Sequence, residues 1–262
     1  MNASDTVTFS TYAHTSKLNL AVEHTPAATN GSTPHVIFCG GFHSTMQGTK
    51  ALALKTHCQA NGWHYTRFDY RGHGQSDGDP ADFTLLDWLN DTLAVLAEHP
   101  QPAVLVGSSM GAWLATLAAL EQPEAVTALL LLAAAPDFLQ RQVKPHLTPS
   151  DVWDLQQGQT VNLPNEYETA HPITQGLLDS AEKLSLLDSN TLESLTCPVR
   201  LIHGTVDTVV PFESATLYLE RLPVSHDARL TLLHNADHRL SDERSLSYIN
   251  HELSTLVDHM NL

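Results

Sequence analysis

The chain has 262 residues, of which 42% are hydrophobic and 16% charged, and its formal net charge is −16. This length suits one domain with a full core. The acidic charge argues against nucleic acid or anionic lipid as a partner, because both are bound through basic surfaces. The longest apolar run, residues 126–135, is too short to cross a bilayer, so we expect a buried strand there.

Short β-rich runs alternate with helical stretches along most of the chain. The expected strands are residues 6–12, 17–23, 35–39, 64–69, 103–107, 127–133, 199–203 and 228–234. The expected helices are residues 49–61, 85–98, 110–121, 212–222 and 243–259. The first two strands lack a helix-length gap between them, so they should form an antiparallel hairpin at one edge. The alternation predicts an α/β fold with a mostly parallel, eight-stranded sheet and helices on both faces.

The alternation breaks between residues 136 and 198, where proline is frequent. An insertion of this size in an α/β sheet usually lies over the carboxyl ends of the strands, where ligands bind. We therefore expect residues 137–195 to form a cap subdomain after the sixth strand, and residues 1–136 and 196–262 to form the core. A structural excursion away from the chemistry is the alternative. Candidates to line an acyl pocket in this stretch are Trp153, Tyr167 and Leu177.

A candidate nucleophile lies in residues 107–111, Gly-Ser-Ser-Met-Gly, which follow an apolar strand and precede a helix of small and aliphatic residues. This context is typical of a nucleophile elbow, in which glycines allow a sharp turn that exposes the central serine. Ser109 is therefore the candidate nucleophile. Ser108 precedes the elbow position, so we expect its hydroxyl to point sideways into the fold and to have a structural role.

A serine hydroxyl needs a base to remove its proton, and histidine has a suitable pKa for that task. His238 lies in the loop after the last expected strand and before the final helix, where this kind of fold supplies its base. His234, at the end of that strand, is the alternative. We interpret His43, His73 and His203 as local hydrogen-bonding groups.

The acid that orients the base should also follow a strand. Asp207 comes after a glycine turn at the end of the strand at 199–203, and it gives the chain order Ser, Asp, His that is typical of this fold. Asp137, which follows the preceding strand, is the rival. Asp237 is adjacent to His238 and cannot easily turn back to orient it, so we interpret it as structural.

Two backbone N–H groups are needed to bind the oxyanion of an acyl-transfer reaction. One donor is expected from Met110, directly after the nucleophile, and the other from the small-residue loop 40–44, where Phe42 is our candidate. A second glycine-rich loop, residues 69–78, lacks the spacing of a phosphate cradle, so it implies neither a nucleotide nor a catalytic role.

Five segments carry a family resemblance: GGFHSTMQGTKALAL, RFDYRGHGQSDG, LVGSSMGAWLA, RLIHGTVDTVVP and ADHR. The chain resembles the α/β-hydrolases and, more narrowly, the subfamily of the mitochondrial palmitoyl-protein thioesterase that also hydrolyses mycophenolic acid acyl-glucuronide, with its bacterial relatives. The resemblance covers about residues 35–240 and is weakest in the expected cap. It implies that Ser109, Asp207 and His238 take the family's nucleophile, acid and base positions.

The expected activity is hydrolysis of a small to medium acyl ester, or of a thioester, through an acyl-enzyme intermediate. Carbon–carbon bond hydrolysis, lactone opening and perhydrolysis on the same residues are alternatives, because one triad hosts many chemistries. A binding module without activity is a further alternative, which the intact triad disfavours. We expect no cofactor and no metal ion, and the sequence leaves open whether the protein is a monomer or a homodimer.

The expected location follows from cysteine usage and the N-terminus. The three cysteines, Cys39, Cys58 and Cys197, lack metal-ligand spacing and indicate free thiols in a reducing compartment. The N-terminal residues show neither a secretory signal pattern nor a transit peptide. We therefore expect a cytoplasmic protein.

Overall fold

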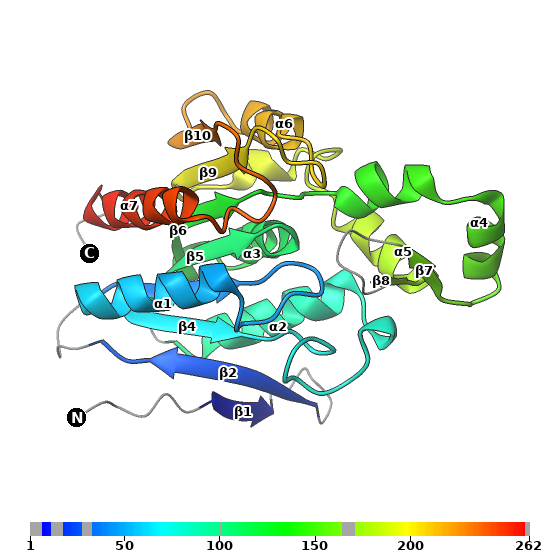
Figure 1. The fold of residues 1–262 in the computed structure, drawn as a ribbon, viewed down its shortest axis with the longest axis horizontal. Helices are drawn as coiled ribbons and strands as arrows, with labels where there is room; N and C mark the ends of the chain where they lie inside the picture. The colour runs from blue at the N-terminus through cyan, green and yellow to red at the C-terminus, as the bar shows by residue number, and fades with distance from the viewer. Residues whose placement is uncertain (1–6, 12–17, 28–32, 100, 164–170, 260–262) are drawn as a thin grey trace.

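The computed structural model describes residues 7–11, 18–27, 33–99, 101–163 and 171–259. The strands of its main sheet are β1 (Val7–Thr11), β2 (Asn19–Thr25), β3 (His35–Cys39), β4 (His64–Phe68), β5 (Ala103–Ser108), β6 (Val126–Leu132), β9 (Val199–Gly204) and β10 (Ala228–Leu233). They form one eight-stranded sheet in the order β1-β2-β4-β3-β5-β6-β9-β10 (Figure 1). β1 pairs antiparallel with β2, and β2 pairs antiparallel with β4. The other neighbours are parallel, which confirms the predicted sheet and its edge hairpin.

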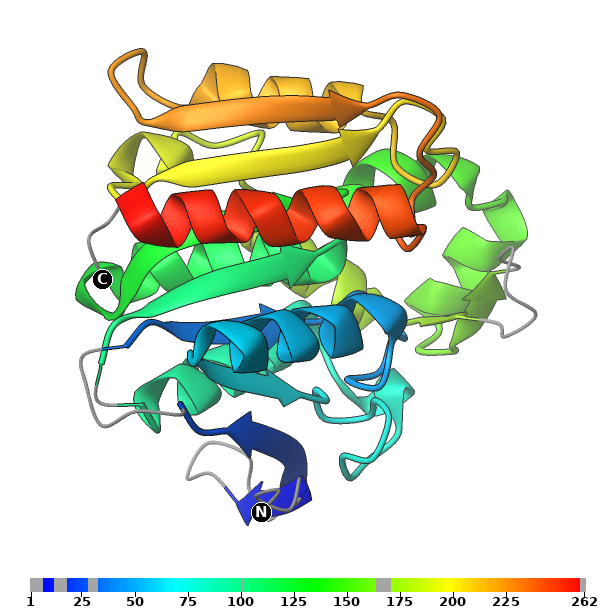
Figure 2. The same cartoon turned by 60° about the vertical axis from the view of Figure 1, so that its left-hand side comes forward.

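Helices cover both faces of the sheet. They are α1 (Thr49–Asn61), α2 (Leu85–Ala97), α3 (Met110–Glu121), α6 (Glu213–Arg221) and α7 (Glu243–His259). Figures 1 and 2 show α1 and α7 together on one face and α2, α3 and α6 on the other. The alternation of side chains along β3 explains how both layers are held. Val36 and Phe38 belong to the core under α1 and α7, whereas Ile37 and Cys39 belong to the core under α2 and α3.

Local signals in the sequence account for several helix boundaries. Thr84 caps α2 through a capping box with Asp87, since each side chain bonds the other residue's backbone N–H. α1 ends at Asn61 and is capped by Gly62, whose φ of 73° lies in the left-handed region that glycine adopts without strain. α3 is buried along almost its whole length, which explains its run of alanine and leucine.

The chain between β6 and β9 holds short elements that lie beyond the carboxyl ends of the parallel strands (Figures 1 and 2). They are a π-helical turn at Leu139–Val143, a 3-10 turn at Lys144–His146, α4 (Pro149–Gln156), β7 (Val161–Leu163), β8 (His171–Ile173) and α5 (Gln175–Lys183). A 3-10 turn at Thr191–Ser194 lies shortly before the start of β9. β7 and β8 form a separate antiparallel pair, which the sequence analysis did not predict. Two further 3-10 turns, Pro80–Asp82 and Pro123–Ala125, lie in connections of the main sheet.

The expected strand at 17–23 is placed two residues too early. β2 extends to Thr25 because that residue pairs with Tyr65 of β4, a long-range contact that periodicity alone does not indicate. The other described boundaries differ from the expected ones by at most one residue. Position 17, the outer residues of the expected first strand and Tyr167 lie outside the described residues. Of the helices that the structure describes, none is long and apolar enough to cross a membrane.

Candidate active site

Ser109 occupies the sharp turn between β5 and α3. Its backbone φ of 55° and ψ of −118° are unusual for a residue with a side chain. Two glycines make this turn feasible. A Cβ at Gly107 would lie 2.5 Å from the Cα of Ala112, and one at Gly111 would lie 2.1 Å from the carbonyl oxygen of Cys39. Any larger residue at either position would therefore push the turn apart.

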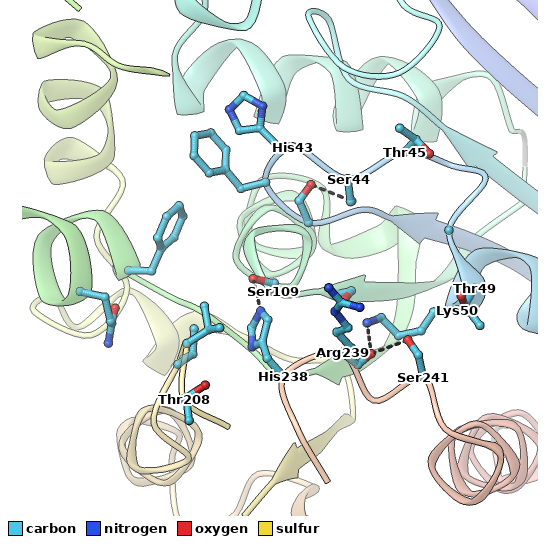
Figure 3. Close-up of a pocket in the computed structure, with 18 of the residues that line it drawn as sticks. His43, Ser44, Thr45, Thr49, Lys50, Ser109, Thr208, His238, Arg239 and Ser241 are labelled. Atoms are coloured by element: carbon cyan, nitrogen blue, oxygen red, sulfur yellow. Dashed lines mark hydrogen bonds between the residues drawn. The ribbon is translucent and has the colours of Figure 1, made fainter. Parts of the chain in front are cut away.

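The structure brings together the three residues that the sequence singled out. Nε2 of His238 lies 3.1 Å from Oγ of Ser109 (Figure 3). Nδ1 of the same ring lies 2.7 Å from Oδ2 of Asp207. The three residues come from separate places in the chain: the elbow after β5, the loop after β9 and the loop after β10. This geometry has the order that a nucleophile, a base and an orienting acid require.

The Asp207 carboxylate is completely buried and fully engaged in hydrogen bonds. Oδ1 accepts the backbone N–H groups of Val209 and Val210 at 2.9 and 2.8 Å. Burial by itself would raise the pKa of Asp207, but hydrogen bonds from His203 and His238 and the backbone outweigh it and hold that pKa well below its usual range. Asp207 therefore stays ionised beside the imidazole.

A second histidine contacts the same carboxylate, and the sequence analysis assigned it no such role. Nε2 of His203 lies 3.0 Å from Oδ2 of Asp207 and 2.9 Å from the carbonyl oxygen of Val210. Nδ1 of His203 is buried without a hydrogen-bond partner among the described residues. Since Nε2 faces two acceptors, we assign the ring proton to Nε2. The sequence offered one indication of this contact: His203 lies at the carboxyl end of the strand that precedes Asp207.

The rival acid, Asp137, binds a different part of the chain. Its carboxylate accepts hydrogen bonds from Oγ of Ser185 at 2.8 Å, from the N–H of Leu186 at 2.9 Å and from the N–H of Leu187 at 2.8 Å. Burial raises the pKa of Asp137. These contacts connect the end of β6 to the return of the inserted chain, so Asp137 serves as a structural link.

The other residues considered in the sequence analysis also take no part in the Ser109–His238–Asp207 hydrogen bonds. His234 is exposed, and its carbonyl oxygen accepts a bond from Arg244 at 3.4 Å. Asp237 accepts from the backbone N–H groups of Arg239 and Leu240 at 3.0 and 3.2 Å and so stabilises the turn that carries His238. Ser108 is buried and lines the same cavity as Ser109.

The loop after β3 packs directly against the elbow. A Cβ at Gly41 would lie 3.3 Å from the Cβ of Ser109, so the two backbones are in contact there. The carbonyl oxygen of Gly41 accepts from the backbone N–H and Oγ of Ser44 at 3.1 and 2.8 Å, which closes a tight turn around Phe42. Met110 opens α3, and the first N–H groups of a helix have no partner within it.

A cavity of about 780 Å³ opens above Ser109. Its apolar wall includes Phe42 from the loop after β3, and Phe138, Val143 and Ile173 from the inserted chain. The rings of Phe42 and Phe138 lie 5.6 Å apart. Of the expected pocket residues, Leu177 is buried in the core and Trp153 is largely exposed, and neither lines this cavity.

The opposite wall of the cavity is polar and basic. Figure 3 shows Thr49, Lys50, Arg239 and Ser241 on one side of the Ser109–His238 pair. Nζ of Lys50 donates to the carbonyl oxygen of Arg239, and burial lowers the pKa of Lys50 to about 8. No motif in the sequence marks Lys50, which stands on the first turn of α1.

The fold and the hydrogen-bonded Ser109, His238 and Asp207 are typical of serine hydrolases with an α/β-hydrolase fold. A family model described as serine aminopeptidase, S33 (Hydrolase_4), matches residues 32–245. The chain belongs to this family of α/β-hydrolases and is an enzyme of the serine hydrolase class.

Individual relatives narrow the comparison and confirm the resemblance seen in the sequence. Palmitoyl-protein thioesterase ABHD10, mitochondrial, of Bos taurus is 36% identical over 242 residues, which cover 88% of this chain and 75% of that protein. The solved structure of alpha/beta hydrolase domain-containing protein 10 from mouse has a TM-score of 0.86 and 33% identity, and the match covers 97% of this chain and 99% of that one. A putative hydrolase from Agrobacterium vitis S4 has a TM-score of 0.87 and 29% identity over 97% of this chain and 98% of its own.

These relatives contradict the cytoplasmic location expected from the sequence. The thioesterases of Bos taurus and Homo sapiens are both named as mitochondrial proteins. The expectation was wrong because free thiols are typical of any reducing compartment and do not distinguish the cytoplasm from the others.

Proposed function

We propose that this protein hydrolyses carboxylic thioesters and esters of small to medium acyl groups through a covalent acyl-enzyme on Ser109. The observation that carries the proposal is the continuous chain of hydrogen bonds from Ser109 through His238 to the buried Asp207, at the base of a cavity with an apolar wall. The relatives named palmitoyl-protein thioesterase support the thioester as the substrate class.

In the acylation half, Oγ of Ser109 attacks the carbonyl carbon while Nε2 of His238 takes its proton. Asp207 stabilises the imidazolium that forms, because its carboxylate is ionised and bonded to Nδ1. The backbone N–H groups of Phe42 and Met110 bind the oxyanion, where each donor contributes about 3 kcal/mol to transition-state stabilisation. The tetrahedral intermediate then collapses, and His238 protonates the departing thiolate or alkoxide.

In the deacylation half, His238 removes a proton from water as the water oxygen attacks the acyl-enzyme carbonyl. The second tetrahedral intermediate expels Oγ of Ser109, which regains its proton from His238. The products are a carboxylic acid and a thiol or an alcohol, so the reaction balances without any oxidant or cofactor.

We also propose that residues 137–195 act as a cap that helps to select the acyl group. Phe138, Val143 and Ile173 from this segment line the same cavity as Ser109. Asp137 bonds to residues 185–187, so the two ends of the segment are held together near the base of the cavity. An acyl chain bonded to Ser109 would extend along Phe42 and Phe138.

Covalent labelling tests the nucleophile. The wild-type protein should react with a fluorophosphonate probe or phenylmethylsulfonyl fluoride, and a digest should place the adduct on Ser109. Ser109→Ala should abolish both labelling and p-nitrophenyl butyrate hydrolysis, whereas the matched Ser108→Ala variant should retain both. Unchanged hydrolysis in Ser109→Ala would refute the mechanism.

A panel of substrates tests the acyl group. The kcat/KM values for acyl thioesters and p-nitrophenyl esters of increasing chain length should rise and then fall as the chain fills the cavity. Phe138→Trp should move the highest kcat/KM toward shorter acyl chains, because the larger side chain narrows the cavity. A chain-length profile that is unaffected by Phe138→Trp would contradict the proposed part of the cap in selection.

A further inference from the structure

Four histidines gather at the end of the sheet away from the cavity. His35 and His64 are the first residues of the parallel strands β3 and β4, whereas Ser109 follows the last residue of β5. His24 lies near the end of the antiparallel β2, and His99 follows α2. The rings of His35 and His99 lie 3.9 Å apart, and those of His24 and His35 lie 5.4 Å apart. The cluster is thus separate from the proposed catalytic residues.

Three of these rings aim a nitrogen at one buried hydroxyl, that of Thr66. Nδ1 of His24, Nε2 of His35 and Nε2 of His99 lie 2.9, 2.8 and 3.2 Å from Oγ1 of Thr66. The three nitrogens all lie within 4.8 Å of one another. Each imidazole therefore presents a potential ligand atom to the same small volume.

The three imidazoles are held in the uncharged form, which is the form that binds metal ions. Burial, helped by the neighbouring imidazoles, lowers the pKa of His35 to about 2 and that of His99 to about 4. Burial and His64 also lower the pKa of His24. The Thr66 hydroxyl has one proton and can donate it to only one of the three nitrogens, so the other two imidazoles donate their ring N–H to Thr66 and must shift that proton to the other ring nitrogen when an ion binds.

The fourth histidine, His64, is not one of the three candidate ligands. Nδ1 of His64 accepts the backbone N–H of Ala27 at 3.2 Å, which leaves the ring proton on Nε2. In that tautomer His64 has no lone pair available, so the ligand set consists of three nitrogens. Nitrogen donors without carboxylates favour Zn²⁺ and its neighbours in the transition series over Mg²⁺ and Ca²⁺.

We propose that His24, His35 and His99 form a binding site for a Zn²⁺ ion, with the Thr66 hydroxyl beside the fourth coordination position. Tetrahedral zinc with bonds of about 2.0–2.1 Å needs ligand atoms about 3.3 Å apart. The distances from Thr66 Oγ1 to the three nitrogens are already close to that spacing. His24 is exposed and its Nδ1 already faces Thr66, so this residue gives the ion a route from solvent.

This site departs from the expectation that the chain binds no metal. The sequence offered no indication, because the three ligands are spread over separate elements without the short spacing of familiar zinc motifs. A bound ion would join β2, β3 and the end of α2. It would therefore stabilise the fold and leave the chemistry at Ser109 unchanged, since a ligand that binds only the folded state raises its stability.

Metal binding is measured on the full chain without an added histidine tag, after treatment with a chelator. Equilibrium dialysis with atomic absorption should find one Zn²⁺ per chain, and the melting temperature should rise with Zn²⁺ but not with Mg²⁺. Co²⁺ in the same site should give visible d–d absorption bands of a four-coordinate ion. His24→Gln and His99→Gln should each weaken Zn²⁺ binding by more than about tenfold.

Three matched variants separate this site from other histidines. His251→Gln changes an exposed histidine of α7, His64→Gln changes the cluster member outside the ligand set, and His238→Gln removes the candidate base. All three should keep the Zn²⁺ affinity of the wild type. Circular dichroism without metal verifies that His24→Gln and His99→Gln are folded. Wild-type affinity in both of those variants, equal loss in His64→Gln, or no binding by the wild type would each overturn the proposal.

Discussion

Two groups of histidines lie at opposite ends of the same sheet, and in each group several rings contact one oxygen-bearing side chain. His238 and His203 share the carboxylate of Asp207, whereas three imidazoles of the other group share the hydroxyl of Thr66. The carboxylate can neutralise a positive ring, so an imidazolium can form beside it during a reaction. The hydroxyl carries no charge that could stabilise a positive ring, and burial together with the neighbouring imidazoles lowers the pKa of His35 and His99. Under the two proposals above, the side chain that the rings share distinguishes a histidine proposed to transfer a proton from histidines proposed to bind a metal ion.

Asp207→Asn tests the proposed role of the carboxylate beside His238 and should have the largest effect. An amide cannot stabilise the imidazolium or hold the required tautomer, so kcat for an ester substrate should fall by about 10⁴-fold. Asp137→Asn is the matched control, since Asp137 is a buried aspartate after a neighbouring strand. Its stability should fall, and its activity at a temperature where it is folded should remain near that of the wild type. A larger loss of kcat in Asp137→Asn would reverse the assignment of the acid.

His203 sharpens the comparison, because we expect it to act through Asp207 as a positioning residue. His203→Leu removes the second donor to the carboxylate and should lower kcat by roughly 10- to 100-fold while KM stays unchanged. His203→Gln keeps an N–H near the position of Nε2 and should restore most of the activity. Equal defects in kcat and KM, without rescue by Gln, would indicate a packing role alone.

Thr66→Val tests whether the Thr66 hydroxyl organises the histidine cluster. It removes the hydroxyl that the three imidazoles contact and keeps the side-chain volume nearly constant. The buried nitrogens that bond it would lose their partner, so the free energy of unfolding should drop by about 1–3 kcal/mol in urea titrations without metal. Thr127→Val is the control, because the Thr127 hydroxyl has no hydrogen-bond partner among the described residues. That variant should be close to neutral. Similar values for both would show that Thr66 does not organise the cluster.

The last prediction concerns the pH dependence of stability. The unfolded chain takes up protons at His35 and His99 below about pH 6.5, whereas the folded protein holds their pKa values at about 2 and about 4. The free energy of unfolding should therefore fall as the pH falls from 6.5 toward 4, by roughly 1 kcal/mol per pH unit for each histidine.

Chemical denaturation at pH 7 and pH 5 measures this slope, and His99→Gln should make it shallower. His251→Gln should have the slope of the wild type, since His251 is exposed on α7. A slope in His99→Gln equal to that of the wild type would mean that His99 is protonated in the folded state.

The sequence predicts those features that local pattern encodes. The elbow at Ser109 is visible because its glycines, strand and helix are contiguous, and His238 and Asp207 are visible because each follows a strand in the expected order. The group around Thr66 is hidden from such reasoning, because its members are contributed by separate elements that only the sheet order brings together. β7 and β8 were missed for a related reason, since strands of three residues carry too little periodicity to be detected.

The bonds from Asp137 to residues 185–187 have a consequence for how this enzyme can change over evolutionary time. They pin the two ends of residues 138–184 together, so the intervening chain is a closed loop on a preformed base. The entropy of closing a loop grows only slowly with its length. Insertions and deletions at exposed positions of this loop therefore cost the core little stability, whereas residues such as Leu177 that are buried in the core are constrained. New substrate preferences can arise there while the chemistry below them is inherited unchanged.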